Sequence, residues 1–368
     1  RDATRLTPDM LPLVALSQAQ LDTLVADIPG GAANVQDVYP LAPLQSGMLF
    51  HHLLDERGDV YLLRVALRFD SRPRLSACLA RLQQVVDRHA VLRTCRRWGG
   101  LAEPVQLVQR QAVLPVDEHD APVDGSSAEE HLLRLTDPRT RQLDLQRAPL
   151  MEAHIMPEPG HDSWLMALLV HHLALDHQAL EVMQREISLL IEGRDDELAP
   201  AQPFRNYVAQ ARLGLSAELH EAFFREQLGR VEEPTLPYGL ADVQGDGRGV
   251  SEARRSLPAA LCAGLRAQAR RLGVSVASLC HQAYAQVLGR ISGRDDVVFG
   301  TVLFGRLQGG EGADQALGLY INTLPLRVTL DGAVGDAVKG VQRDLAGLLR
   351  HEHAPLALAQ RCSGLGAG

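Results

Sequence analysis

Two adjacent histidines mark the part of this chain best suited to proton chemistry. His171 and His172 stand directly after the apolar run Trp164 to Val170, and Asp176 follows four residues after the second histidine. Histidine changes charge near neutral pH, so a buried strand that ends in histidines can hold one imidazole ready to accept or donate a proton. Adjacent side chains on a strand point to opposite faces, and we therefore expect one of the two to be structural.

Asp176 has two possible roles beside these histidines. It lies one short loop after His172 and could fix the turn by bonding backbone groups or an arginine, which would hold the imidazole in place. Histidine and aspartate are also common metal ligands, so a metal site is an alternative, and a polar strand end without chemistry is another. The bimetal hydrolase pattern would need a histidine where Ala174 stands, so we predict no metal.

Length and composition predict a folded chain in two parts. The chain has 368 residues, whereas single hydrophobic cores stop growing beyond roughly 250 to 300 residues. An apolar share of 46% and a charged share of 22% are ordinary for globular proteins. The polar, turn-rich stretch Glu192 to Pro203 is the best linker candidate. We place the first lobe at residues 1–195 and the second at 196–368.

Charge and cysteine content exclude several classes of protein. The formal net charge is -8 and aromatic residues make up 4% of the chain, so the basic surface typical of nucleic-acid binding is absent. The five cysteines are odd in number and scattered, which predicts reduced thiols. No apolar stretch approaches the roughly 20 residues of a membrane span, and no signal peptide opens the chain. We expect a cytoplasmic protein without nucleic-acid or membrane partners.

The sequence pattern mixes helices and strands along its whole length. Apolar periodicity, capping residues and turn signals define these elements. The main ones are helices after Ser17, from Pro43 and after Ser275, a charged helix near Glu129 to Arg141, and strands over Val60 to Phe69, Trp164 to Val170 and Leu317 to Leu330. This mixture predicts an α/β (α+β) fold.

The segment HHLALDH, His171 to His177, resembles the His-His-x-x-x-Asp-Gly signature of condensation domains from nonribosomal peptide synthetases, with His177 in place of the usual glycine. Five further segments resemble other motifs of that family and occur in the same order. They are YPLAPLQSGMLF (residues 39–50), DRHAVLRT (87–94), PFRNYVAQ (203–210), LGLYINTLPLR (317–327) and HEHAPLALAQ (351–360).

The resemblance implies a fold and a reaction. The family is built as two lobes resembling chloramphenicol acetyltransferase, arranged as a V-shaped pseudodimer with a central tunnel. The reaction is peptide-bond formation between an upstream peptidyl or aminoacyl carrier-protein thioester and the amine on a downstream aminoacyl carrier protein. Substrates arrive on phosphopantetheine, so no cofactor is bound directly, and an adenylation domain is a neighbour. Such synthetases make antibiotics or lipopeptides. Family members usually continue beyond the last motif, so the second lobe is expected to lack its last tens of residues.

The resemblance also assigns roles to residues of this chain. His172, with His171 beside it, is the expected catalytic imidazole, which accepts a proton or holds the amine in line. Asp176 is the structural aspartate, which usually pairs with an arginine from the other lobe, and Arg327 is the matching position. Asn322 and His177 complete the structural set at the site.

A second histidine pair points to a subtype. HHLLDERGD, His51 to Asp59, resembles the His-His-x5-Gly-Asp signature of dual epimerization and condensation domains. The resemblance implies that the donor Cα is converted from L to D before condensation, with His172 as the base and His51 or His52 returning a proton or shaping the donor side. The alternatives are a plain condensation domain for D-donors and a non-catalytic carrier-protein gate.

Overall fold

The computed structural model describes residues 5–54, 58–123, 125–241, 250–306 and 312–365. The chain forms two compact units. Unit 1 comprises Arg1–Gly214 and Gly305–Ile321, and unit 2 comprises Leu215–Phe304 and Asn322–Gly368. The first unit therefore extends past the predicted boundary at residue 195, and it also includes a segment from late in the chain.

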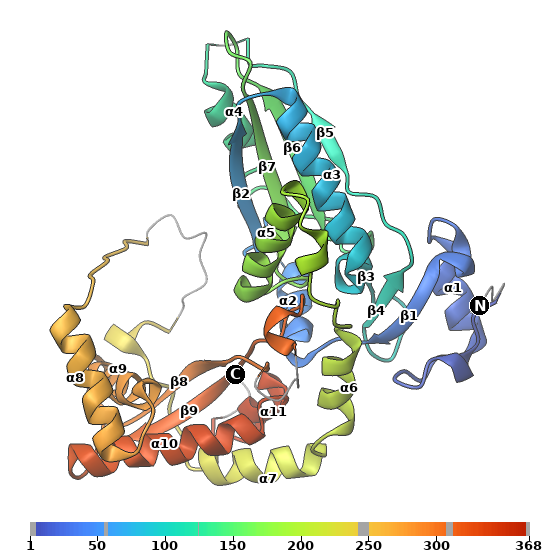
Figure 1. The fold of residues 1–368 in the computed structure, drawn as a ribbon. Helices are drawn as coiled ribbons and strands as arrows, with labels where there is room; N and C mark the ends of the chain where they lie inside the picture. Colours follow the sequence, from blue (N-terminus) through green and yellow to red (C-terminus); the bar gives the residue numbers. More distant parts are fainter. Residues whose placement is uncertain (1–4, 55–57, 124, 242–249, 307–311, 366–368) are drawn as a thin grey trace. The chain divides into compact units, whose positions relative to one another are not determined.

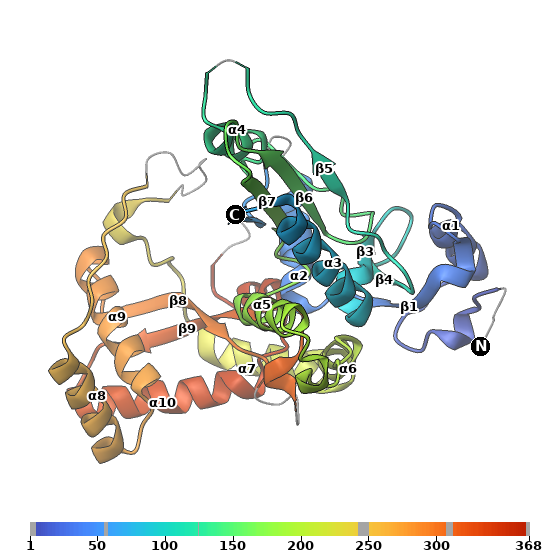
Figure 2. The same ribbon diagram turned by 45° about the horizontal axis from the view of Figure 1, so that its top comes forward.

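Unit 1 is built on a four-stranded sheet with strand order β2-β7-β6-β5 and a three-stranded sheet with order β1-β4-β3 (Figures 1 and 2). Its strands are β1 (Val35–Pro40), β2 (Leu62–Phe69), β3 (Thr94–Arg97), β4 (Val105–Gln109), β5 (Val116–Glu118), β6 (Met151–Pro157) and β7 (Trp164–His171). Its α-helices are α1 (Gln18–Ala26), α2 (Pro43–Leu54), α3 (Arg72–Arg88), α4 (Ala128–Leu135), α5 (His177–Ile191) and α6 (Arg205–Leu213).

The interior strand β7 carries the first of the paired histidines. It pairs antiparallel with β2 on one side and with β6 on the other. Every residue of β7 after Trp164 is buried, as expected for a continuous apolar run covered on both faces. Helix α3 packs on one face of this sheet and α4 on the other, through the apolar clusters that contain Leu82 and Leu132. The strand end that presents His171 is therefore fixed by packing on both sides.

Unit 2 contains a two-stranded antiparallel sheet and five α-helices among its described residues. The strands are β8 (Asp296–Leu303) and β9 (Asn322–Thr329), and the helices are α7 (Ala217–Leu228), α8 (Ala259–Leu272), α9 (Val276–Ser292), α10 (Val334–Arg350) and α11 (Leu356–Arg361). The core of this unit joins Phe224 of α7, Leu288 of α9, Leu324 of β9 and Leu348 of α10. Both units mix helices and strands, which confirms the predicted α/β class.

Two predicted elements differ from the structure. The charged helix expected to reach Arg141 ends at Leu135, where the Thr136 side chain donates to the carbonyl of Leu132 and Pro138 follows two residues later. The strand expected over Leu317 to Leu330 begins only at Asn322. Periodicity could not show where the strand begins, because an apolar run looks alike whether it pairs in a sheet or packs as a loop.

Two compositional predictions can also be compared with the structure. All five cysteines are free thiols, as predicted, and Cys78, Cys95 and Cys362 are buried. Within the described ranges, no helix has both the length and the apolar character needed to span a lipid bilayer.

Candidate active site

His171 is the structural member of the histidine pair. Its side chain is fully buried at the end of β7. Its Nδ1 accepts from the amide of Leu173 (3.0 Å), and its Nε2 lies 2.8 Å from Oδ2 of Asp59. Burial lowers the pKa of His171, and the hydrogen bond with Asp59 offsets this only in part. The ring is therefore neutral, carries its proton on Nε2, and has no nitrogen left for a substrate. Its predicted catalytic role is not supported by this geometry.

His172 lies immediately after the strand and is partly exposed. Its amide donates to the carbonyl of Tyr61 (2.8 Å), which continues the pairing of β2 and β7 by one residue. Its Nδ1 is buried, and no described residue bonds it. The imidazole expected to lead the chemistry is thus positioned by backbone and lacks a carboxylate behind it.

The turn after His172 is anchored by two side chains that the sequence did not single out. The carbonyl of Leu173 accepts from Nε2 of Gln45 (2.8 Å) and from Nη2 of Arg96 (2.9 Å). Both side chains are fully buried, and burial lowers the pKa of Arg96 to about 10, so it remains charged at neutral pH. Gln45 belongs to the YPLAPLQSGMLF segment, so this motif supports the histidine turn.

Asp59 is the central residue of the site and was quoted only as the end of the second histidine motif. Its side chain is almost fully buried. Oδ2 lies 2.6 Å from Nδ1 of His52 and 2.8 Å from Nε2 of His171, and Oδ1 accepts from the amide of Tyr61 (2.9 Å). Burial raises the pKa of Asp59, but the hydrogen bonds from His171 and His52 outweigh it and hold the pKa below its ordinary value. Asp59 is therefore a carboxylate shared by two histidines from separate motifs.

Gly58 explains why the second motif ends in Gly-Asp. A Cβ at this position would collide with the carbonyl oxygen of Arg139, and the amide of Asp59 donates to the carbonyl of Pro138 (2.8 Å). Only glycine lets the backbone pass this close. Residues 55–57 of the motif lie outside the described residues.

The paired histidines of α2 have different surroundings. Successive helical residues point about 100° apart, so His52 faces Asp59 while His51 faces Tyr61. Nδ1 of His51 lies 2.9 Å from the Tyr61 hydroxyl, and His51 is exposed. Only 9% of the His52 side chain is exposed, and its Nε2 makes no hydrogen bond to a described residue. His52 therefore joins the buried cluster, and His51 does not.

Asp176 pairs with Arg306, which corrects the predicted pair with Arg327. Oδ1 accepts from Nη2 of Arg306 (2.7 Å) and from the amide of Ala179 (2.8 Å), and Oδ2 accepts from the amide of Tyr320 (3.0 Å). Arg327 on β9 instead pairs with Asp296 on β8 (2.7 Å). The prediction was wrong because the segment Gly305–Ile321 belongs to unit 1 and supplies Arg306, whereas Arg327 lies on β9 in unit 2.

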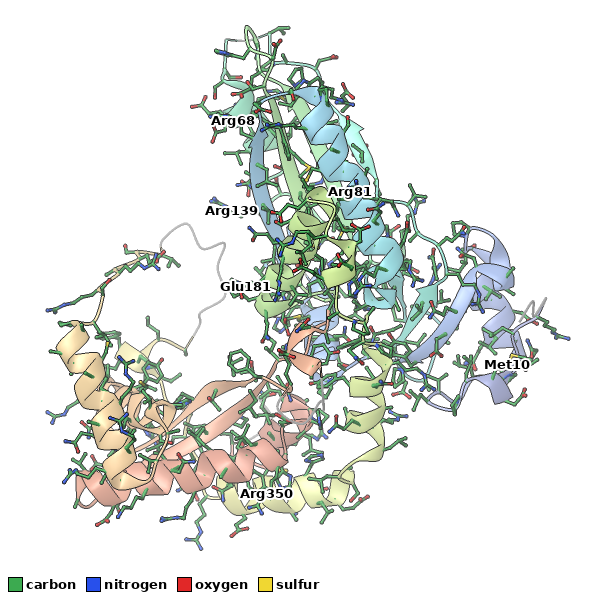
Figure 3. The ribbon with its side chains drawn as sticks, viewed as in Figure 1. Met10, Arg68, Arg81, Arg139, Glu181 and Arg350 are labelled. Atoms are coloured by element: carbon green, nitrogen blue, oxygen red, sulfur yellow. The ribbon has the colours of Figure 1, made fainter. Side chains whose placement is uncertain are left out.

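The two remaining predicted residues have their bonding partners within their own units. Asn322, at the start of β9, donates to the carbonyls of Glu352 (2.7 Å) and Ala354 (2.8 Å), so it joins two predicted motifs inside unit 2. His177 opens α5 directly after its cap Asp176, with 89% of its side chain exposed and an ion-pair distance of 3.3 Å to Glu181. Glu181 projects from the exposed side of α5 (Figure 3). Both residues have structural or surface positions.

His52, Asp59 and His171 also have the residue types of a metal site. One ligand atom from each lies within 4.8 Å of the others. Around a tetrahedral metal with bonds of about 2 Å, ligand atoms lie more than about 3 Å apart. Here the oxygen lies 2.6 and 2.8 Å from the nitrogens, and the Nε2 of His171 already carries a proton. The geometry fits hydrogen bonds, and the absence of a bound metal stays a prediction.

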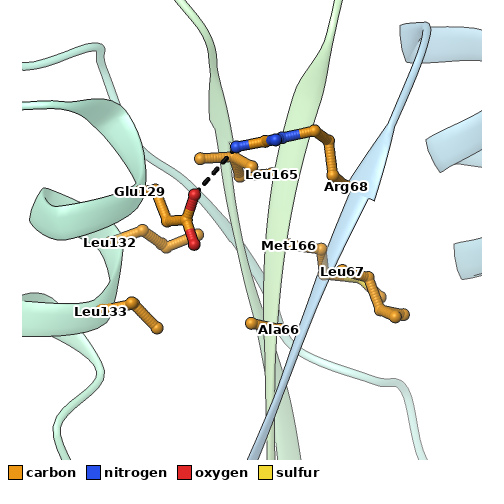
Figure 4. A pocket seen from close by; sticks show the side chains of 8 residues that line it. All are labelled: Ala66, Leu67, Arg68, Glu129, Leu132, Leu133, Leu165 and Met166. Atoms are coloured by element: carbon orange, nitrogen blue, oxygen red, sulfur yellow. Dashed lines mark hydrogen bonds and ion pairs between the residues drawn. The ribbon is translucent and has the colours of Figure 1, made fainter.

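A separate cavity of about 180 Å³ lies between β2, β7 and α4 (Figure 4). Its lining is apolar except for Arg68 and Glu129, which pair with each other at 2.9 Å. None of the predicted site residues lines it. Because its two charged groups are already paired, we assign it no part in the chemistry.

Residues 35–365 match the condensation-domain family. The chain belongs to the condensation-domain family of nonribosomal peptide synthetases. It is 50% identical to malpinin synthetase of Mortierella alpina over 366 residues, which cover 99% of this chain and 5% of that protein. It is 48% identical to malpibaldin synthetase of the same organism, over 99% of this chain and 7% of that protein. The domain therefore spans only a small part of these relatives.

Solved structures share the fold of this condensation domain. A four-domain nonribosomal peptide synthetase bound to AMP and glycine aligns with a TM-score of 0.71 at 19% identity, covering 89% of this chain and 25% of that chain. The first condensation domain of the calcium-dependent antibiotic synthetase, in complex with a substrate analogue, aligns with a TM-score of 0.65 at 21% identity, covering 90% and 78%. These matches support the predicted two-lobed fold class.

Proposed function

We propose that this domain forms a peptide bond between an upstream acyl thioester and a downstream amine, after epimerizing the donor Cα from L to D. Family membership and the ordered motifs support the condensation step. The observation that carries the epimerization step is the link between motifs: Asp59, from the dual-type segment, bonds His171 of the condensation signature and His52 together.

Condensation asks little of an acid–base group. An α-amino group has a pKa of about 8, so part of it is already neutral near pH 7. Holding two tethered reactants in line can supply effective molarities on the order of 10⁵ M or more. His172 then hydrogen-bonds the amine or takes its proton as the tetrahedral intermediate forms. Positioning is the main contribution, and proton transfer is secondary.

Epimerization needs stronger acid–base catalysis than condensation does. The proton on the Cα of an acyl thioester is far less acidic than an ammonium group, and the enolate formed needs fixed donors around its oxygen. A base on one side of Cα and an acid on the other can invert the centre. The second motif brings further histidines, one of them bonded to the buried carboxylate of Asp59, so the site has more proton-transfer groups than condensation requires.

The partners follow from the proposed reaction. Upstream and downstream carrier proteins bring the substrates on phosphopantetheine arms, and an adenylation domain loads the downstream carrier. The domain binds no cofactor of its own and works in the cytoplasm as part of a larger synthetase that makes an antibiotic or lipopeptide.

Stereochemical analysis of the product tests both steps. The upstream carrier is loaded separately with L- and D-aminoacyl groups, and the downstream carrier with one L-amino acid. We expect the same D,L-dipeptide from both donors, and in D₂O we expect deuterium at the donor Cα from the L-donor. An L,L-product, or turnover of the D-donor alone, would contradict epimerization and leave condensation. No dipeptide from either donor would contradict condensation itself.

A further inference from the structure

Only one of the four histidines at this site is held by a carboxylate and still has a ring nitrogen unoccupied by the described residues. That residue is His52. We infer that His52 is a second proton-transfer group beside His172, and that Asp59 is the positioning residue that holds it. This inference rests on the proposed epimerization, and it distinguishes His52 from His51, which the sequence left equivalent.

The hydrogen bonds define the orientation of the His52 ring. Nδ1 donates to Oδ2 of Asp59 at 2.6 Å, and so Nε2 is the nitrogen that can exchange a proton with a substrate. Asp59 itself cannot turn away, because His171 and the amide of Tyr61 bond it as well. A buried carboxylate that orients an imidazole and stabilises its charged form is the arrangement that activates histidine in acid–base catalysis.

The other three histidines lack one part of this arrangement. Both nitrogens of His171 are bonded within the protein. His172 has a buried Nδ1 with no described partner, so no carboxylate balances the charge it gains with a proton. His51 is exposed and bonds a neutral hydroxyl on Tyr61. His52 is therefore the histidine whose ring is both fixed by a carboxylate and free at Nε2 to pass a proton to a substrate.

These differences assign one proton transfer of the inversion to His172 and the other to His52. The neutral imidazole of His172 takes the proton from Cα, the C–H electron pair forms the enolate double bond, and the carbonyl electron pair moves to the thioester oxygen. The imidazolium of His52 then returns a proton from Nε2 to the opposite face, and the electron pair goes back to Cα. His172 gives its extra proton to water, and His52 takes one from water, which restores both rings.

The test compares inversion at Cα with condensation in Asp59→Asn and His52→Gln. With an L-donor, we expect formation of the D-configured donor residue to fall by about 100-fold or more in both variants, because acid–base groups contribute about 10² to 10⁴ in rate. With a D-donor, which needs no inversion, we expect dipeptide formation to fall by less than about tenfold. Asp87→Asn, which alters an exposed carboxylate on α3, is the matched control and should invert the L-donor like wild type.

The outcomes separate this inference from the function on which it rests. A parallel loss of inversion and D-donor condensation would show that Asp59 and His52 act only on structure, and the inference would fall. Inversion that persists in His52→Gln would also overturn it. Since His52→Gln leaves Asp59 bonded to His171 and Tyr61, this result stays informative if Asp59→Asn does not fold. If wild type condenses without exchanging the α-proton, the epimerization proposal fails together with the role of His52.

Discussion

Asp59 and Asp176 are both almost fully buried, and both lie in networks that reach the histidine segment, but their partners differ in kind. Asp176 pairs with Arg306 and accepts two backbone amides. Asp59 is shared by His52 and His171. Arginine stays charged at every pH a protein meets, whereas histidine exchanges its proton near neutrality. Aspartate therefore forms a permanently charged ion pair in one region, Asp176 with Arg306, which we call the brace. In the other region it joins a cluster of titratable histidines.

The brace also has a distinct architectural role. The guanidinium of Arg306 donates to the carbonyls of Ala313 and Ala316 and lies 4.3 Å from the ring centre of Tyr320. Asp176 caps α5 at the same time. One buried ion pair thus fastens the segment Gly305–Ile321 to the helix that follows the histidines, and this contact is independent of the Asp59 cluster.

Removing the brace should have the largest effect. In Asp176→Ala, Arg306 is left buried without its counter-charge, which costs about 3 to 5 kcal/mol. Urea unfolding measures this loss, and Arg327→Ala is the comparison, since Arg327 is partly exposed and bonded to Asp296. A soluble Asp176→Ala protein with wild-type stability and no activity would contradict the structural role and place Asp176 in the chemistry instead.

A glycine substitution tests how tightly the backbone fixes the Asp59 cluster. Gly58→Ala adds a Cβ against the carbonyl of Arg139, and we expect it to lower stability by about 1 to 3 kcal/mol. Gly47→Ala is the matched control, because a Cβ there meets nothing within 4 Å in the middle of α2, and it should stabilise by about 0.5 to 1 kcal/mol. Thermal or urea unfolding of both variants is the measurement. Equal stability changes would show that the Gly58 backbone can move aside.

The pH dependence of the free energy of unfolding should also distinguish the Asp59 cluster from the Asp176–Arg306 pair. We expect this effect to be the smallest of the three. Burial lowers the pKa of folded His171 below its ordinary value of 6.5, so the unfolded chain binds a proton first as the pH falls. The stability that depends on neutral His171 is complete above about pH 6.5 and is lost as the pH falls toward the folded pKa. His171→Gln should therefore be less stable at pH 7.5 yet lose less between pH 7.5 and 5.5 than wild type. Urea unfolding at both pH values measures this difference.

The brace supplies the control for that experiment. Asp176→Ala leaves Arg306, which keeps its charge throughout this pH range, so the stability of this variant should fall with pH as steeply as that of wild type. The comparison would fail if His171→Gln and wild type lost the same stability between the two pH values.

Local signals predicted much of the fold. Ser17 and Ser275 cap α1 and α9 through their side chains, and Pro43 begins α2, as the sequence suggested. The apolar run Trp164 to Val170 forms β7. These features are readable because caps, proline and continuous apolar stretches act over a few residues. The end of α4 and the start of β9 were not, because packing decides them.

The sequence predicted which residues belong to the site better than it predicted their bonding partners. His52, His171, His172 and Asp176 were named from sequence, but Asp59 received no role and Asp176 was given the wrong arginine. A usable signal existed for Asp59: an acidic residue after glycine, seven positions beyond His52. No such signal existed for Arg306, because nothing in its neighbourhood shows that Gly305–Ile321 belongs to unit 1.

The sequence by itself determined the family, the order of the motifs and the histidines available for chemistry, because these depend on residue types and spacings along one chain. The tertiary structure decided which histidine is buried and saturated, which one a carboxylate holds, and which arginine neutralises Asp176. The burial and bonding of His171 and the arginine partner of Asp176 depend on contacts between segments more than 100 residues apart, Asp59 with His171 and Asp176 with Arg306. Hydrogen-bond partners and desolvation arise only when such segments are brought together, and they determine what each imidazole can do.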